Sequence, residues 1–128
     1  LRRLKNHLYS GLVGSGGVFS SSGPTILSKH KFRFSIFGHV ADGNFHCMII
    51  NDPTNHSEHD EIRDVTHKMA SRIIALGGTC TGEHGIGMGK IELLIEETGE
   101  SAVSLMRKIK RTLDPNWILN PGKVLAIE

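Results

Sequence analysis

An α+β fold, with an antiparallel β-hairpin followed by amphipathic helices, is predicted by three patterns in this sequence. Asp42-Gly43 separates two runs rich in Phe, Ile and Val, which is a strong signal for a hairpin. Further along the chain, apolar residues recur at spacings of three and four, as they do on one face of a helix. Breaks at Gly77-Gly78 and Thr98-Gly99 divide this helical part into three segments.

The hairpin strands are predicted over Phe32–Val40 and Asn44–Asn51. A two-residue type I′ turn at Asp42-Gly43 places residues opposite each other when their numbers sum to 85, so His39 faces His46. Facing residues on an antiparallel pair have Cβ atoms roughly 4.5–5.5 Å apart on the same face. Two imidazoles at that separation can chelate one metal ion. The hairpin is therefore predicted to supply half of a metal site.

Three helices are predicted after the hairpin, each with an apolar stripe that we expect to be core. The first has Ser57 as its N-cap and ends at Gly77-Gly78. The second is expected around Lys90–Glu97, and the third over Glu100–Leu113, where Asp114-Pro115 stops it. The apolar stripe of the first helix is Ile62, Val65, Met69 and Ile73. That of the third is Val103, Met106, Ile109 and Leu113.

Residues 1–34 differ in composition from the remainder. They carry six Lys/Arg and no acidic residue, whereas the remainder has nine Lys/Arg against thirteen Asp/Glu. Together with the Ser- and Gly-rich run Gly14–Pro24, this predicts an atypical basic segment that is disordered. Arg- and Ser-rich, acid-free composition is also typical of a mitochondrial transit peptide, although the chain has no initiator Met and is expected to be a fragment.

The sequence disfavours a nucleic-acid-binding arm, a membrane span and a disulfide framework. A nucleic-acid-binding arm is disfavoured because aromatic residues are not interleaved with the basic ones. No run is long and apolar enough to span a bilayer. Cys47 and Cys80 do not form a CxxC pair, so a reducing compartment is favoured over a disulfide framework.

A glycine-rich segment follows the first predicted helix. Four of the eight positions from Gly82 to Gly89 are glycine, which implies sharp turns or a close approach of a ligand. A phosphate-binding loop is excluded, because His84 stands where its first glycine is needed and Ile91 follows Lys90. A dinucleotide fingerprint is excluded because Lys90 occupies the position of its third glycine. What remains is an acid and an imidazole, Glu83-His84, in a tightly turned loop.

Two histidines and a carboxylate that leave one position open are the ligand set of a catalytic zinc or another borderline divalent ion. Glu83 is predicted to be the third ligand beside His39 and His46, while an exposed Glu-His pair without a metal is the alternative. In an extended loop His84 points elsewhere and is available as a proton acceptor. Cys80 is a weaker rival ligand and is expected to be a buried thiol.

Three blocks resemble the C-terminal part of FAD-linked oxidases, and most closely the mitochondrial, cytochrome-linked D-lactate dehydrogenases among them. The blocks are Gly38–His46, Thr79–Gly87 and Leu119–Lys123, in the same order and spacing, and the resemblance covers about residues 35–126. It implies a domain over residues 35–128 with a mostly antiparallel sheet and flanking helices. This domain would be the substrate side of a two-part flavoenzyme whose larger part holds the FAD.

The resemblance also implies roles for particular residues. The metal ligands of the family fall on His39, His46 and Glu83, and its catalytic base falls on His84. Asn120 is implied to lie near the flavin, and Asn44 near the substrate or flavin. Zinc, manganese and iron all suit such ligands. The implied partners are a small 2-hydroxy acid and an electron acceptor such as cytochrome c, and the implied location is the mitochondrion.

The implied reaction is oxidation of a D-2-hydroxy acid such as D-lactate to the 2-oxo acid. A divalent ion lowers the pKa of the substrate hydroxyl, His84 takes its proton, and the α-carbon passes a hydride to the flavin. We expect the chain alone neither to retain FAD tightly nor to turn over D-lactate. The alternative is a non-enzymatic metal-binding or interaction module, derived from such an enzyme by loss of its flavin domain.

Overall fold

The computed structural model describes residues 5–13, 27–52 and 54–127. The Ser- and Gly-rich run Gly14–Pro24 and the basic residues Arg2 and Arg3 lie outside these ranges. The chain divides into two compact units, the first ending at His84 and the second beginning at Gly85. Each unit is described by itself.

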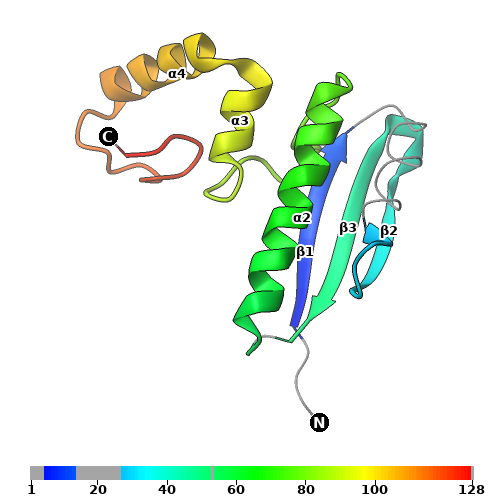
Figure 1. The fold of residues 1–128 in the computed structure, drawn as a ribbon. Helices are drawn as coiled ribbons and strands as arrows, with labels where there is room; N and C mark the ends of the chain where they lie inside the picture. Colours follow the sequence, from blue (N-terminus) through cyan, green and yellow to red (C-terminus); the bar gives the residue numbers. More distant parts are fainter. Residues whose placement is uncertain (1–4, 14–26, 53, 128) are drawn as a thin grey trace. The chain divides into compact units, whose positions relative to one another are not determined.

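The first unit contains a three-stranded antiparallel sheet in the order β1-β3-β2 (Figure 1). The strands are β1 (Lys5–Val13), β2 (Arg33–His39) and β3 (Asn44–Asn51). The predicted bounds of β3 are confirmed, and β2 is one residue shorter at each end than predicted. Because β3 is the central strand, its backbone is paired along both edges.

Strand β1 corrects the expectation that residues 1–34 lack regular structure, at least for its nine residues. It pairs with β3 from Lys5 opposite Asn51 to Val13 opposite Asn44. A backbone ladder needs no particular side-chain period, so composition did not reveal this strand. The register shifts by one residue between Tyr9 and Leu12, which produces a β-bulge across from His46.

The predicted two-residue turn at Asp42-Gly43 is wrong. The loop between β2 and β3 contains a 3-10 turn, η1 (Val40–Asp42), and only Gly43 takes positive φ, at 69°. Facing residues in β2 and β3 therefore have numbers that sum to 83, so His39 faces Asn44 and His46 faces Phe37. The 3-10 turn followed by one glycine with positive φ connects the two strands, so Asp42 does not need to adopt positive φ.

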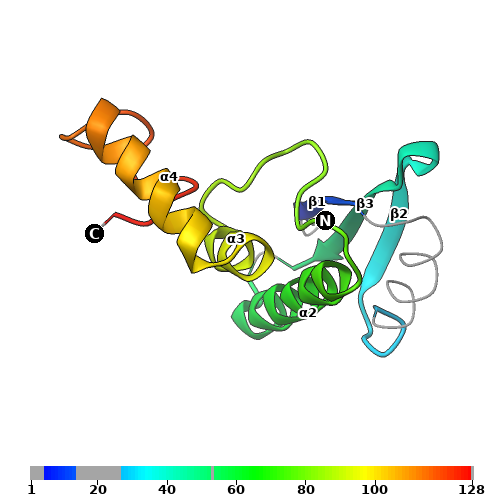
Figure 2. The same ribbon diagram turned by 90° about the horizontal axis from the view of Figure 1, so that it is seen from above.

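Helix α2 (His56–Ala75) lies across one face of the sheet (Figures 1 and 2). Its N-cap is Asn55 rather than Ser57, because the Asn55 side chain accepts a hydrogen bond from the Glu58 N–H at 3.2 Å. It ends as predicted, where Gly77 takes a φ of 82° and the Gly78 N–H donates to the Ile73 carbonyl. The predicted apolar stripe of α2 is confirmed as core, since Ile62, Val65, Met69 and Ile73 are all buried.

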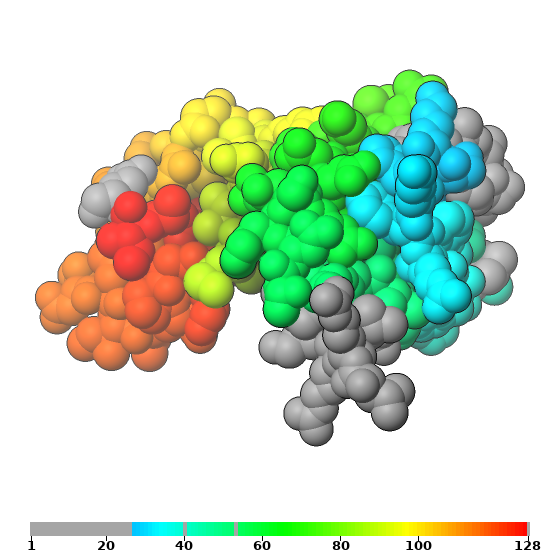
Figure 3. Space-filling model, turned by 60° about the horizontal axis from the view of Figure 1, so that its bottom comes forward, coloured from blue at the N-terminus to red at the C-terminus, as the bar shows by residue number. Residues whose placement is uncertain are grey.

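The two faces of β3 have different neighbours. Asn51 contacts His59 of α2 through its side chain, so the odd-numbered residues of β3 face the helix. Phe45, Cys47 and Ile49 on that face are buried with the α2 stripe. Residues 27–32, the segment before β2, also contact α2, because the His30 Nδ1 lies 2.6 Å from the Glu61 Oε1. Figure 3 shows this segment beside the green surface of α2. The even-numbered face of β3 carries His46.

The second unit consists of α3 (Ile91–Thr98), α4 (Glu100–Leu113) and the segment that follows. The predicted bounds of α4 are confirmed, and α3 is shifted by one residue. Leu94, Val103 and Leu125 form the buried core of this unit. The expectation that the whole α4 stripe is core is wrong, because Ile109 is 52% exposed and Leu113 is 77% exposed. None of the described helices is both long and apolar enough to cross a membrane.

Candidate metal centre

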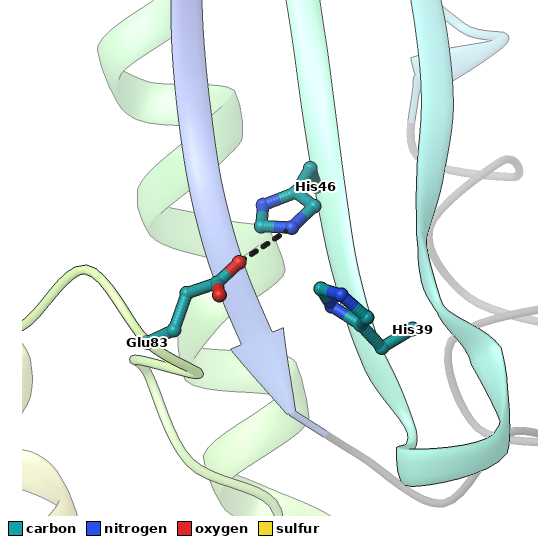
Figure 4. A group of neighbouring side chains, drawn as sticks. All are labelled: His39, His46 and Glu83. Atoms are coloured by element: carbon teal, nitrogen blue, oxygen red, sulfur yellow. Dashed lines mark ion pairs between the residues drawn. The ribbon is translucent and has the colours of Figure 1, made fainter.

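Three side chains of the first unit converge on one point (Figure 4). His39 ends β2, His46 lies near the start of β3, and Glu83 comes from the loop after α2. One potential ligand atom from each lies within 4.8 Å of the other two. The Glu83 Oε1 lies 2.7 Å from the Nε2 of His46. The structure therefore brings together the three residues that the sequence predicted as metal ligands.

The two histidines share a face even though the predicted turn is wrong. The observed register differs from the predicted one by two residues, and side chains alternate between faces with a period of two. His39 is therefore a diagonal neighbour of His46 rather than its direct partner, and their ring centroids are 6.2 Å apart. An odd shift would have moved one imidazole to the helix face.

His84 does not point away from the cluster, contrary to the prediction. Its Nε2 lies 3.6 Å from the Glu83 Oε1, and its ring centroid lies 5.4 Å from that of His46. The prediction assumed an extended loop, in which consecutive side chains alternate. The backbone bends at residues 82–84 instead, so Glu83 and His84 both reach the same place.

The cluster is buried on one side and open on the other. His46 is only 7% exposed, whereas the Glu83 and His84 side chains are each 44% exposed and His39 is exposed. A carboxylate between two imidazoles creates a site with negative charge and nitrogen lone pairs. These ligand types suit a divalent cation, and the open side of the cluster leaves room for a small ligand to reach it.

The spacing of the three side chains fits such an ion. Zinc–nitrogen and zinc–oxygen bonds are about 2.0–2.2 Å, so two ligands of one ion lie no more than about 4.4 Å apart. The three candidate ligand atoms already lie within 4.8 Å of one another. Small rotations of the exposed His39 and Glu83 side chains would reduce these distances to the limit of about 4.4 Å. Two nitrogens and a carboxylate suit zinc, manganese and iron. Cys80, the rival ligand, is a buried thiol as expected and is not one of the group.

The two predicted cofactor-binding asparagines lie in different units. Asn44 is 8% exposed, and its Nδ2 is 3.5 Å from the His39 Nδ1, so it adjoins the candidate metal ligands. Asn120 is exposed in the segment after α4, with a φ of 46°. The roles of both asparagines toward flavin or substrate stay predictions.

Sequence reasoning missed Asp114, which it interpreted only as part of a helix stop. The carboxylate of Asp114 is buried and accepts hydrogen bonds from the Lys110 side chain and from the backbone N–H groups of Ile118 and Leu119. These bonds, led by the one from Lys110, hold the pKa of Asp114 below its ordinary value. Asp114 thereby anchors the turn that leads to Asn120. An aspartate four residues after a lysine near a helix end was the available signal.

The family model of the C-terminal domain of FAD linked oxidases matches residues 24–124. The chain therefore belongs to this family, and the match begins upstream of residue 35, where the resemblance was predicted to start. A probable mitochondrial D-lactate dehydrogenase of Danio rerio is 51% identical over 101 residues, which are 79% of this chain and 20% of that protein.

Other relatives carry related names. The mitochondrial D-lactate dehydrogenase [cytochrome] 1 of Saccharomyces cerevisiae is 48% identical over 102 residues, 80% of this chain and 17% of the relative. The glycolate oxidase subunit GlcD of Bacillus subtilis is 36% identical over 101 residues, 79% of this chain and 22% of the relative. The chain spans about a fifth of the length of these relatives.

Proposed function

We propose that this chain is the C-terminal, substrate-side part of a mitochondrial FAD-dependent D-2-hydroxy acid dehydrogenase that oxidises D-lactate. The proposal depends mainly on one observation, the convergence of His39, His46 and Glu83 with His84 beside them. Family membership supports the flavin, and the names of the relatives in Danio rerio and Saccharomyces cerevisiae support the substrate and the location. The name of the yeast relative also supports a cytochrome as electron acceptor.

His39, His46 and Glu83 would hold the divalent ion, which supplies Lewis-acid polarisation of the substrate hydroxyl. His46 fixes the site because it is buried in the central strand, while the more exposed His39 and Glu83 leave the site accessible. Histidine binds a metal as the neutral imidazole, so Glu83 would contribute the one negative charge of the ligand set, and a bound dication would keep a net positive charge. That positive charge would attract the carboxylate of a 2-hydroxy acid to the site.

His84 accepts the proton of the substrate hydroxyl in this proposal. Imidazole suits the task because its ordinary pKa lies near neutral pH. The Nε2 of His84 lies 3.6 Å from the Glu83 Oε1, so the ring that takes up the proton lies directly beside the residues that would hold the ion. FAD, when bound by the enzyme, supplies the acceptor for the hydride that leaves the α-carbon. Asn120 is proposed to lie at the flavin.

The base assignment can be tested in a chimera. The matching segment of the Saccharomyces cerevisiae relative is replaced by the corresponding residues of this chain, and D-lactate-dependent reduction of cytochrome c is measured. We expect an active chimera in which His84→Gln lowers kcat about 10²–10⁴-fold while bound metal and FAD are retained. His56→Gln, which changes an exposed histidine at the start of α2, is the matched control and should leave kcat unchanged.

The outcomes separate the candidate functions. An active chimera whose kcat is insensitive to His84→Gln contradicts the assignment of the base. A folded chimera that binds FAD and metal but oxidises neither D-lactate nor glycolate supports the alternative, a non-enzymatic metal-binding module. Activity on glycolate that exceeds activity on D-lactate would transfer the proposal to the substrate named for the Bacillus subtilis relative.

A further inference from the structure

Asn44 occupies a distinctive place beside the metal ligands. It is the first residue of β3, it faces His39 across the β2–β3 pair, and it precedes His46 by two residues. Cross-strand partners and residues two apart share a face of the sheet. Asn44 therefore lies on the same face as both histidines, and its side chain is more than nine-tenths buried.

The side-chain amide of Asn44 is satisfied at one end only. Its Nδ2 lies 3.5 Å from the Nδ1 of His39. Its Oδ1 is buried and accepts no hydrogen bond from the part of the chain that the structure describes. A buried acceptor without a donor is unfavourable, and in a native protein it calls for an explanation. Oxygen and nitrogen exchange places when the amide rotates by half a turn.

The orientation of the amide decides which nitrogen of His39 can bind a metal. When the Asn44 Nδ2 donates to Nδ1, the single proton of a neutral imidazole must be on Nε2. A protonated nitrogen has no lone pair for a metal. When Oδ1 faces His39 instead, Nδ1 carries the proton and Nε2 is a ligand. Histidines that bind metals commonly donate their second N–H to an oxygen acceptor in this way.

We propose that Asn44 is the positioning residue of the metal centre: its Oδ1 accepts the Nδ1–H of His39 and thereby presents Nε2 to the ion. This inference rests on the metal site of the proposed function and goes beyond it. The half-turn of the amide satisfies the buried oxygen and selects the tautomer of His39 at the same time. His39 is exposed at the end of its strand, so a hydrogen bond from its Nδ1 would restrict the orientation of its ring.

Zinc binding by the full 128-residue chain tests the proposal. Zn²⁺ is titrated against a competing chelator, and the dissociation constant is compared among wild type, Asn44→Leu, Asn44→Asp and Asn51→Leu. We expect Asn44→Leu to weaken zinc binding about 10–100-fold, because the acceptor is lost. Asn44→Asp keeps an acceptor and loses the N–H donors, so it should bind zinc at least as tightly as wild type.

Asn51→Leu is the matched control. Asn51 is the buried asparagine at the other end of β3, and its Oδ1 also has no donor among the described residues. It contacts His59 on the helix face instead of the metal ligands. We expect Asn51→Leu to leave the zinc affinity within about twofold of wild type, whatever it does to stability.

A spectroscopic measurement does not depend on any variant. In the zinc-loaded wild-type chain, ¹⁵N-labelled histidine distinguishes the protonated nitrogen of His39 from the metal-bound one, and we expect the proton on Nδ1. Zinc bound through Nδ1, or undiminished affinity in a folded Asn44→Leu chain, would overturn the role of Asn44 and leave the metal site standing. A wild-type chain that binds no zinc would overturn the inference together with the metal centre, which the activity of the chimera then tests separately.

Discussion

Helices α2 and α4 carry similar apolar patterns but differ in what covers them. In α2 the apolar stripe lies against a three-stranded sheet, and Ile62 is only 1% exposed. In α4 only Val103 is fully buried, although the stripe continues through Ile109 and Leu113. An amphipathic period specifies which face of a helix is apolar, and a separate element must supply the surface that buries it. The described part of the second unit supplies that surface only at the start of α4.

The comparison extends to the candidate functional residues. The candidate metal ligands of the first unit include His46, which is buried on the central strand, where the backbone is paired on both edges. Asn120 of the second unit lies in an exposed turn that depends on Asp114. Sites on paired strands are held more closely than sites on loops. The chain also carries a probe for each unit, because both cysteines precede residue 85 and the single Trp is Trp117.

Gly38→Ala should lower the free energy of unfolding most, and it should destabilise the first unit more than the second. A Cβ at position 38 would lie 2.3 Å from the carbonyl oxygen of Asn44, and the φ of Gly38 is +152°. Strain and backbone displacement together should cost about 4 kcal/mol of unfolding free energy. Gly77→Ala is the control, since Gly77 has positive φ but its Cβ position has no described atom within 4 Å beyond its own stretch of chain. It should cost only about 1–2 kcal/mol.

Urea unfolding followed by thiol reactivity for the first unit and by Trp117 fluorescence for the second measures both effects. We expect Gly38→Ala to advance the thiol transition more than the fluorescence transition. Equal costs for the two glycine variants would contradict the close approach of β2 to Asn44.

A pair of isoleucine truncations compares the two helices directly. Ile62→Ala should destabilise the chain by about 3 kcal/mol because it leaves a cavity under α2. Ile109→Ala removes the same atoms from a side chain that is 52% exposed and should cost less than about 1 kcal/mol. Chemical denaturation of both variants gives the difference. Similar costs would show that the apolar face of α4 is covered in solution, and dilution over a hundredfold range would then distinguish self-association.

Asp114→Asn should change the pH dependence of the second unit. The folded pKa of Asp114 is lowered, so the ionised group stabilises the fold above its unfolded pKa of about 3.9. That contribution is lost as the pH falls from about 4 through the lowered folded pKa. We expect wild-type Tm, monitored by Trp117 fluorescence, to fall more steeply below pH 4 than that of the variant. Asp60→Asn, which changes an exposed carboxylate on α2, should retain the wild-type profile.

The smallest perturbation is chemical modification of Cys47. Burial raises the pKa of its thiol to about 11, so the reactive thiolate is scarce at pH 8. Folded wild type should react with iodoacetamide far more slowly than the chain in 6 M urea. If Cys47 in native buffer reacted as fast as in 6 M urea, the first unit would open readily. The first unit would then not be more tightly packed than the second.

The histidine ligands could be predicted because a register error of an even number of residues leaves every side chain on its predicted face of the sheet. The turn at Asp42-Gly43 was wrong by two residues, and His39 and His46 still share a face. The direction of His84 could not be predicted in this way, because it depends on a local bend of the backbone at residues 82–84. The N-cap of α2 was likewise assigned to Ser57, although Asn55 has the geometry that reaches the Glu58 N–H.

Local pattern alone determined the extents of β3 and α4, the buried stripe of α2 and the residue types able to bind a metal, because each follows from periodicity or from side-chain chemistry. Tertiary structure decided which segments pair and which faces are covered. Strand β1 joins the sheet through backbone hydrogen bonds that depend little on side-chain pattern, and Glu83 reaches His46 only because the chain turns after α2. Such contacts join residues far apart in the chain, and their energies depend on the whole arrangement rather than on any one segment.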